Sequence, residues 1–154
     1  MSVDSHPQTQ TIRLTVETDL EKLTDVVTWF EQFKKPLICQ QTWLEAQIAI
    51  VEGFTNAVQH AHQHLPPSTP IALEVQVSSQ VLRIWIWDQG KAFDFDLNLQ
   101  AMHQITSDHR FDPLERQAHW GSIILLKLMT DKGWQIAYER PTSYQNCLKL
   151  EKNL

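Results

Sequence analysis

Residues Val51–His62 read VEGFTNAVQHAH, a stretch in which Glu52, Asn56 and His60 follow one another at intervals of four residues. Residues four apart lie on the same face of an α-helix, so the spacing predicts a stripe made of an acid, an amide and an imidazole. The opposite face of this helix is apolar, which is typical of a helix that packs on a core. Periodicity alone leaves two interpretations open, a solvated helix face or a group of side chains that binds a ligand.

The rest of the chain supplies the elements around this helix, which is expected to run from about Thr42 to His64, where LPPSTP ends it. Alternating apolar residues predict strands, and clusters of Ser, Pro and Gly mark turns. The other expected elements are a strand at 11–18 with Ile12, Leu14 and Val16 inward, a helix at about 20–35 capped by Thr18 or Asp19 and closed by Pro36, a hairpin of 71–77 and 81–87 around Ser78–Gln80, an apolar helix at 122–131 capped by Gly133, and a hairpin of 134–140 and 147–152 around Pro141.

This order of elements predicts a single domain of the α+β class. The expected fold is a two-layer α/β sandwich, with the helices on one face of a mixed, mostly antiparallel sheet. Residues 1–9 are polar and expected to be flexible, whereas residues 10–154 form the domain. About thirty residues after Trp87 show no sustained period, and a connection of that length in a compact domain is typical of a functional lid.

The composition is that of a globular protein, with 42% hydrophobic and 20% charged residues in 154. A formal charge of −5 argues against a general nucleic-acid binder, which usually carries a basic patch. The chain shows neither the apolar core of a signal peptide nor an apolar run long enough to span a membrane, so a cytoplasmic location is expected. Cys39 and Cys147 form no CxxC pair, and each is expected to be a buried thiol.

Two further motifs stand at the edges of predicted elements. Asp88 ends an apolar strand in WDQGKAFD, where its carboxylate could accept a hydrogen bond from an exocyclic amino group, and Gly90 would let the backbone approach a ring closely. Gly121 opens the apolar helix in HWGSIILLKLMTD, and free N–H groups at a helix start favour phosphate oxygens. Taken singly, each motif is also compatible with an ordinary turn or with a glycine before a buried helix.

Together the three motifs resemble those of the GHKL ATPase superfamily, whose Bergerat fold is shared by gyrase-type ATPases, sensor histidine kinases and anti-sigma factor serine kinases. The sequence EGFTNAVQHAH is similar to the E-x-x-T-N-A-V-x-H-A form of the N-box in the anti-sigma factor kinases. DQGKAFDF resembles their D-x-G-x-x-F-D box, and HWGSIILLKLMTD resembles the glycine box before the helix that follows the ATP lid. The likeness covers nearly the whole chain in the right order.

The resemblance implies ATP and Mg²⁺ as cofactors and a role for each matching residue. Asn56 would coordinate Mg²⁺, which prefers oxygen ligands and keeps several waters. Glu52 would act as general base on a serine hydroxyl of a partner protein, and Asp88 would bind the amino group of adenine. The other implied contacts with the nucleotide are His60 in a supporting role, Gly90 beneath the ring, Phe93 in the D-x-G-x-x-F-D box, a lid at about 91–119, and Gly121, Ser122 and Ile123 near the phosphates.

The function implied by the resemblance is that of a serine/threonine protein kinase of the anti-sigma factor type. Such a kinase would phosphorylate a small antagonist protein of the STAS type and sequester a sigma factor or a similar regulator. The resemblance also suggests a homodimer, for which the strand with Ile12, Leu14 and Val16 could offer an edge. Neither nucleic acid nor a membrane is expected as a partner.

Three alternatives remain at this point. The family's glycine box usually reads G-x-G, whereas His119 stands at its first position, which favours a non-catalytic partner-switching module with weakened or lost ATP binding. A detached catalytic domain of a histidine kinase fits less well, because the chain carries no dimerising helical hairpin with a phospho-acceptor histidine. A metal site made of His60, His62 and His64 is disfavoured, because helical residues two apart do not face each other.

Overall fold

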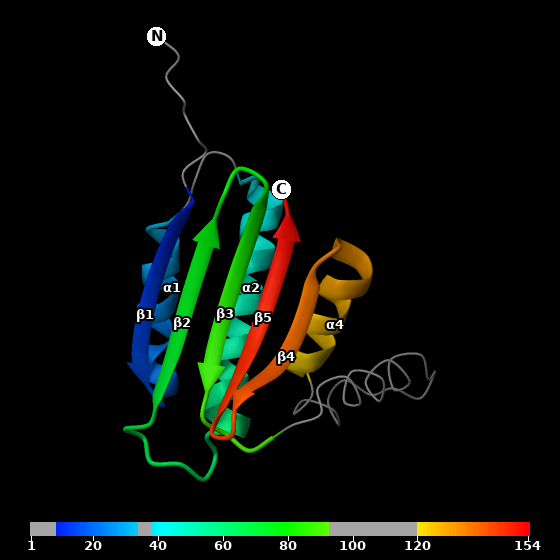
Figure 1. The fold of residues 1–154 in the computed structure, drawn as a ribbon. Coiled ribbons are helices and arrows are strands. Elements are labelled where there is room, and N and C mark those ends of the chain that lie inside the picture. The colour runs from blue at the N-terminus through cyan, green and yellow to red at the C-terminus, as the bar shows by residue number, and fades with distance from the viewer. Residues whose placement is uncertain (1–8, 34–37, 93–119) are drawn as a thin grey trace.

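The fold is a five-stranded sheet with α-helices on one face, as the computed structural model shows for residues 9–33, 38–92 and 120–154 (Figure 1). Along the sheet the strands lie in the order β1-β2-β3-β5-β4, and every neighbouring pair is antiparallel. The predicted two-layer α+β sandwich is therefore confirmed, although the described strands form an antiparallel sheet and not a mixed one. The elements are β1 (Gln10–Glu17), a 3-10 turn (Leu20–Lys22), α1 (Leu23–Glu31), α2 (Gln40–Asn56), a π-helical turn (Ala57–Ala61), β2 (Pro70–Val77), β3 (Val81–Asp88), α4 (Trp120–Lys132), β4 (Gln135–Thr142) and β5 (Gln145–Asn153).

The core lies between the sheet and the helices. Every second residue of β2 and β3 is buried, as the alternating sequence pattern predicts. In the helical layer, Phe30 of α1 stacks on Trp43 of α2 with ring centroids 4.1 Å apart. On β1, Ile12, Leu14 and Val16 are half-buried and pack against this core, because β1 is an edge strand. The expected inward face of that strand is thus confirmed.

The 3-10 turn that leads into α1 and helix α2 each begin at a side-chain cap. Asp19 accepts a hydrogen bond from the N–H of Glu21 at 2.9 Å, so one of the two expected caps is confirmed. Helix α2 begins at Gln40, two residues earlier than expected, because the Cys39 sulfur accepts from the N–H of Thr42 at 3.5 Å. Cys39 is consequently an exposed capping thiol and not the buried one expected, whereas Cys147 is buried as predicted.

Helix α2 does not continue as an α-helix to His64, as the sequence pattern predicted. It ends at Asn56 and passes into the π-helical turn at Ala57–Ala61, where the N–H of His62 bonds the carbonyl of Ala57 at 2.9 Å. A π turn closes through bonds between residues five apart, so two residues four apart across it still lie near one face. Asn56 and His60 therefore stay on the same side, although the α-helix ends between them.

The C-terminal elements differ from the prediction in two details. Helix α4 begins at Trp120, before the expected start at Ser122, and Gly133 beyond its end has the expected positive φ of 73°. The last hairpin turns between Thr142 and Gln145, whereas Pro141 lies within β4, where the register shifts. A proline is tolerated there because β4 is an edge strand and the ladder is already interrupted.

Candidate functional site

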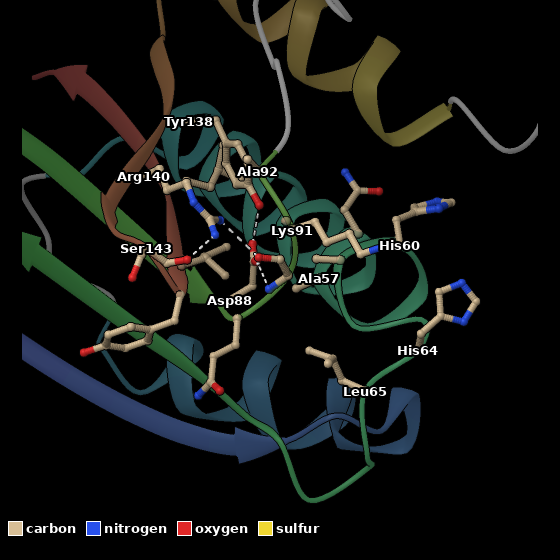
Figure 2. Close-up of a pocket in the computed structure, with 18 of the residues that line it drawn as sticks. Ala57, His60, His64, Leu65, Asp88, Lys91, Ala92, Tyr138, Arg140 and Ser143 are labelled. Atoms are coloured by element: carbon tan, nitrogen blue, oxygen red, sulfur yellow. Dashed lines mark hydrogen bonds between the residues drawn. The ribbon is translucent and has the colours of Figure 1, made fainter.

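A cavity of about 780 Å³ opens where the end of α2 and the π turn meet the segment after β3 and the β4–β5 hairpin (Figure 2). This volume is that of a site for a small molecule such as a nucleotide. The cavity is positioned by a close approach of helix and sheet, since a Cβ on Gly53 of α2 would stand 2.5 Å from the Ile86 side chain of β3. Its lining includes the polar residues Asn56, His60, His64, Asp88, Gln89, Lys91, Tyr138, Arg140, Ser143 and Tyr144, and an apolar group containing Ile86, Leu125 and Leu148.

The structure brings four of the predicted site residues to this cavity. Asn56, His60, Asp88 and Gly90 line it, although they come from two elements that lie far apart in the sequence. Asn56 lies beside a cavity large enough for a nucleotide. Its amide oxygen could be one protein ligand of a Mg²⁺ ion that also binds phosphates and waters.

The remaining predicted residues are placed differently. Glu52, one helical turn before Asn56, is half-buried outside the lining, and the Ile123 side chain is buried in the core with 2% exposed. Gly121 and Ser122 occupy the first turn of α4, whose amide groups lack acceptors within the helix. Phe93, His119 and residues 93–119 of the predicted lid lie outside the described residues.

Asp88 is the most buried acid of the cavity, with 4% of its surface exposed. Its Oδ1 accepts from the N–H of Gly90 and from the Asn146 side-chain amide, both at 2.9 Å. Its Oδ2 accepts from the hydroxyl of Tyr138, which points toward it from β4 (Figure 2). A carboxylate offers about four acceptor positions, so one remains for a donor on a ligand in the cavity.

The β4–β5 hairpin contributes a polar network that the sequence patterns did not predict. Asn146, with 1% exposed, also donates to the carbonyls of Gly90 and Lys91, both at 3.1 Å. Arg140 donates to the Asn146 side-chain oxygen at 2.8 Å and to the Gly90 carbonyl at 3.2 Å. A signal was present in the sequence: Tyr138 and Arg140 follow Ile136 with strand alternation, which puts an arginine on the core-facing side of β4.

Gly90 has a packing role that differs from the predicted one. A Cβ at this position would stand 2.7 Å from the carbonyl oxygen of Ala61 and 2.9 Å from its Cβ. The glycine therefore lets the segment after β3 lie directly against the π turn. Its predicted place beneath an adenine ring stays a prediction.

The charges of the site favour an anionic ligand that also carries a hydrogen-bond donor for Asp88. Among the described lining residues Asp88 is the acid, and Lys91 and Arg140 are bases, so the basic groups outnumber the acidic one. Burial raises the pKa of the Tyr138 hydroxyl, and the bond to Asp88 raises it further, which keeps this hydroxyl a donor. Burial also raises the pKa of Glu52, which brings that carboxylate closer to the range of a general base.

No metal cluster of His, Cys, Asp or Glu side chains forms within the described ranges. The three-histidine alternative is therefore absent, and its middle member, His62, is buried with 2% exposed while His60 and His64 line the cavity. None of the described helices is both long and apolar enough to span a membrane.

Two kinds of known protein match the chain. The family model described as "Histidine kinase-like ATPase domain" matches residues 16–152. The serine-protein kinase RsbW of Bacillus subtilis (strain 168) is 33% identical over 70 residues, which cover 46% of this chain and 43% of that protein. RsbW of Staphylococcus aureus (strain bovine RF122 / ET3-1) is 28% identical over 87 residues, which cover 56% of this chain and 54% of that protein. The chain thus spans about half the length of the curated relatives it matches.

Proposed function

We propose that this chain, which belongs to the histidine kinase-like ATPase family, binds ATP with Mg²⁺ and acts as a serine/threonine protein kinase of the anti-sigma factor type. One observation carries the proposal: Asp88 is held in the cavity wall by three donors and keeps an acceptor position for a further one, as an adenine amino group requires. The matching relatives named serine-protein kinases support the reaction type.

Each residue then has a defined task in binding and transfer. Asp88 accepts from adenine, while Lys91 and Arg140 bring positive charge to the same cavity. Asn56 would supply an amide oxygen to a bound Mg²⁺, whose chemical contribution would be positive charge beside the transferred phosphoryl group. Glu52, with its raised pKa, takes the proton from the serine hydroxyl of the partner protein. Gly121, Ser122 and Ile123 present their amide groups to the phosphates, and His60 borders the opening.

The partners in this proposal are a STAS-type antagonist protein as substrate and a sigma factor or similar regulator as target, in the cytoplasm. A phosphate added to the antagonist would bring negative charge to its binding surface and break a complementary contact. A surface for protein partners on the sheet face away from the helices is supported by Trp85 and Trp87, which stack with centroids 6.5 Å apart and stay partly exposed. Edge strand β1 offers a second surface, suited to a homodimer.

A non-catalytic partner-switching module is the second candidate. It is favoured by the position of Glu52, which does not line the cavity in which the nucleotide would lie. The two candidates share the cavity and differ in turnover, so ATP binding and phosphoryl transfer have to be measured separately.

The first experiment is calorimetric titration of ATP, with and without Mg²⁺, into the wild type and Asp88→Asn. The substitution places an amide where three donors converge and is expected to weaken Mg²⁺-dependent binding by about 10- to 100-fold, the value of a hydrogen bond to a charged group. Asp25→Asn, at an exposed position of α1, is the matched control and is expected to bind as the wild type does. Equal affinities for the wild type and Asp88→Asn would refute the assignment of the cavity.

A further inference from the structure

His62 is a buried histidine that lies behind the cavity and not in its lining. Its Nε2 accepts a hydrogen bond from the backbone N–H of Gln89 at 2.7 Å, and its Nδ1 lies 2.7 Å from the Thr18 hydroxyl. Because a backbone N–H can only donate, Nε2 carries no proton, and the ring proton of the neutral form stands on Nδ1. The Thr18 hydroxyl accepts that proton and donates its own to the carbonyl of Thr69 at 2.6 Å.

This chain of hydrogen bonds joins the two parts of the cavity that carry the predicted nucleotide contacts. His62 follows the π turn that extends α2, the helix of Asn56. Gln89 stands between Asp88 and Gly90, so the bond to its N–H acts on the backbone that directs the Asp88 carboxylate. Thr18, at the end of β1, anchors the other side of the ring.

The segment at 88–91 is held from two sides. On the hairpin side, Asn146 binds Asp88 and the carbonyls of Gly90 and Lys91. On the helix side, Gly90 touches Ala61 and Gln89 binds His62. A change at His62 is therefore expected to alter the separation between Asn56 and Asp88, while the hairpin contacts still hold the segment at its other side.

We propose that His62 is a positioning residue of the nucleotide site, whose neutral ring holds Gln89 so that Asp88 and Asn56 stand at the distance that ATP requires. This inference rests on the proposed function. A second ring proton on Nε2 would face the N–H of Gln89, donor against donor, and the segment at 88–91 would have to move. ATP binding then weakens as the ring becomes charged.

The groups around the ring set the pH at which this happens. Burial lowers the pKa of His62 below its ordinary value of 6.5, and the negative charge of Asp88 partly opposes this. The other charged groups on adjoining segments are Glu17 and Asp19 beside Thr18, Lys91 after β3, and His60 and His64 near His62 in the sequence. With a lowered pKa the ring is neutral at pH 7 and above, and it gains its charge only below pH 6.5.

The test is the dissociation constant of ATP with Mg²⁺, measured from pH 8 to pH 5.5 for the wild type and His62→Gln. Glutamine keeps an acceptor for Gln89 and does not titrate, so it separates geometry from charge. Since the terminal phosphate of a nucleotide itself takes up a proton near pH 6, the ratio of the two constants at each pH removes that contribution. We expect the dissociation constant of the wild type divided by that of His62→Gln to be near one at pH 8. This ratio should rise about tenfold by pH 5.5, because the charged ring of the wild type loses one buried hydrogen bond.

A second variant removes the anchor without touching the cavity. Thr18→Val takes away the acceptor of the Nδ1 proton, which favours the tautomer with its proton on Nε2, and is expected to weaken ATP binding about fivefold even at pH 8. Arg13→Gln on β1, the strand that precedes Thr18, is the matched control and should leave binding unchanged, because this arginine is exposed and pairs with Glu74. Thermal unfolding of each variant checks that it is folded.

Nuclear magnetic resonance supplies a direct view of the contact without nucleotide. The amide signal of Gln89 is expected to shift with the titration of the His62 ring in the wild type and to stay constant in His62→Gln. A ratio of dissociation constants that stays near one at every pH, or a Gln89 signal that ignores the ring, would overturn the inference alone. Absence of ATP binding to the wild type at pH 8 would overturn the proposed function, and the inference with it.

Discussion

The two walls of the cavity are built from different kinds of interaction. The helical wall, formed by the end of α2 and the π turn, presents Asn56 and His60 from neighbouring turns held by local backbone bonds. The hairpin wall presents Tyr138 and Arg140 and is held by the buried Asn146. Tyr138 and Asn146 reach Asp88 only because β5 pairs with β3 and β4 and places Asn146 opposite Asp88. Changes in the first wall should affect chemistry with little loss of stability, whereas changes in the second should affect stability first.

Glu52→Gln, on α2 one helical turn before the helical wall, is expected to have the largest effect. Removing a general base costs about 10²- to 10⁴-fold in rate, so phosphoryl transfer to a serine of the antagonist should fall by that factor. ATP affinity should stay within about threefold, because Glu52 lies outside the cavity lining. Transfer of labelled phosphate and calorimetry measure the two quantities.

Glu31→Gln, an exposed position on α1, is the control for this substitution and should transfer phosphate at the wild-type rate. Equal transfer rates for Glu52→Gln and the wild type would show that Glu52 is not the base, and would favour the non-catalytic module.

Asn146→Ala, in the hairpin wall, is expected to lower the free energy of unfolding by about 2–3 kcal/mol. The side chain is buried, and its loss removes one donor from Asp88 and from the carbonyls of Gly90 and Lys91. Urea denaturation measures the loss, and Asn153→Ala at the exposed end of β5 is the control, expected within about 0.5 kcal/mol of the wild type. Equal stability of the two variants would contradict the expectation that changes in the hairpin wall affect stability first.

Gly90→Ala tests the contact that joins the helical wall to the segment after β3. The added Cβ would meet the backbone of Ala61, so we expect a loss of about 1–3 kcal/mol in unfolding free energy. Gly53→Ala is the comparison, because its Cβ would meet the end of the Ile86 side chain, which can shift, and its effect should be smaller. Thermal or urea unfolding measures both losses. An equal or larger loss for Gly53→Ala would contradict the proposed importance of the contact between Gly90 and Ala61.

The smallest expected effect is a pH dependence of stability that arises from His62. Its pKa is lowered in the folded protein, so the unfolded chain binds the proton more readily. The stabilisation is then complete above the ordinary pKa of 6.5 and decreases as the pH falls toward the lowered value. Glu52, whose pKa is raised from 4.5, acts in the opposite direction, and its stabilisation decreases as the pH rises through its own range.

The difference in unfolding free energy between the wild type and His62→Gln isolates the histidine term, because Glu52 is present in both proteins. This difference should be constant above pH 7. Below pH 7 the unfolding free energy of the wild type should fall relative to that of His62→Gln. A difference that does not change between pH 8 and pH 5.5 would mean that the ring does not titrate in this range.

Local patterns predicted much of the fold and of the helical wall. Strand alternation identified the hairpin around Ser78–Gln80 and the inward face of β1, and Gly133 was recognised as a helix cap. The family resemblance drawn from the three motifs is confirmed by the match over residues 16–152. The site roles of Glu52, Asn56 and Asp88 stay predictions, although two of these residues do line one cavity.

The sequence by itself determined the order of elements, the family and the residues of the N-box, because each of these depends on neighbours within a few positions of the chain. Only the tertiary structure decided that α2 ends in a π turn, that His62 points inward to Gln89, and that the hairpin side chains close around Asp88. The contacts of His62 and of the hairpin with the segment after β3 join residues between 27 and 58 positions apart. Their geometry depends on the strand register of the sheet and on how closely the helix approaches it. No local pattern encodes a distance of that kind, so the polar network of the cavity becomes visible only when the chain is folded.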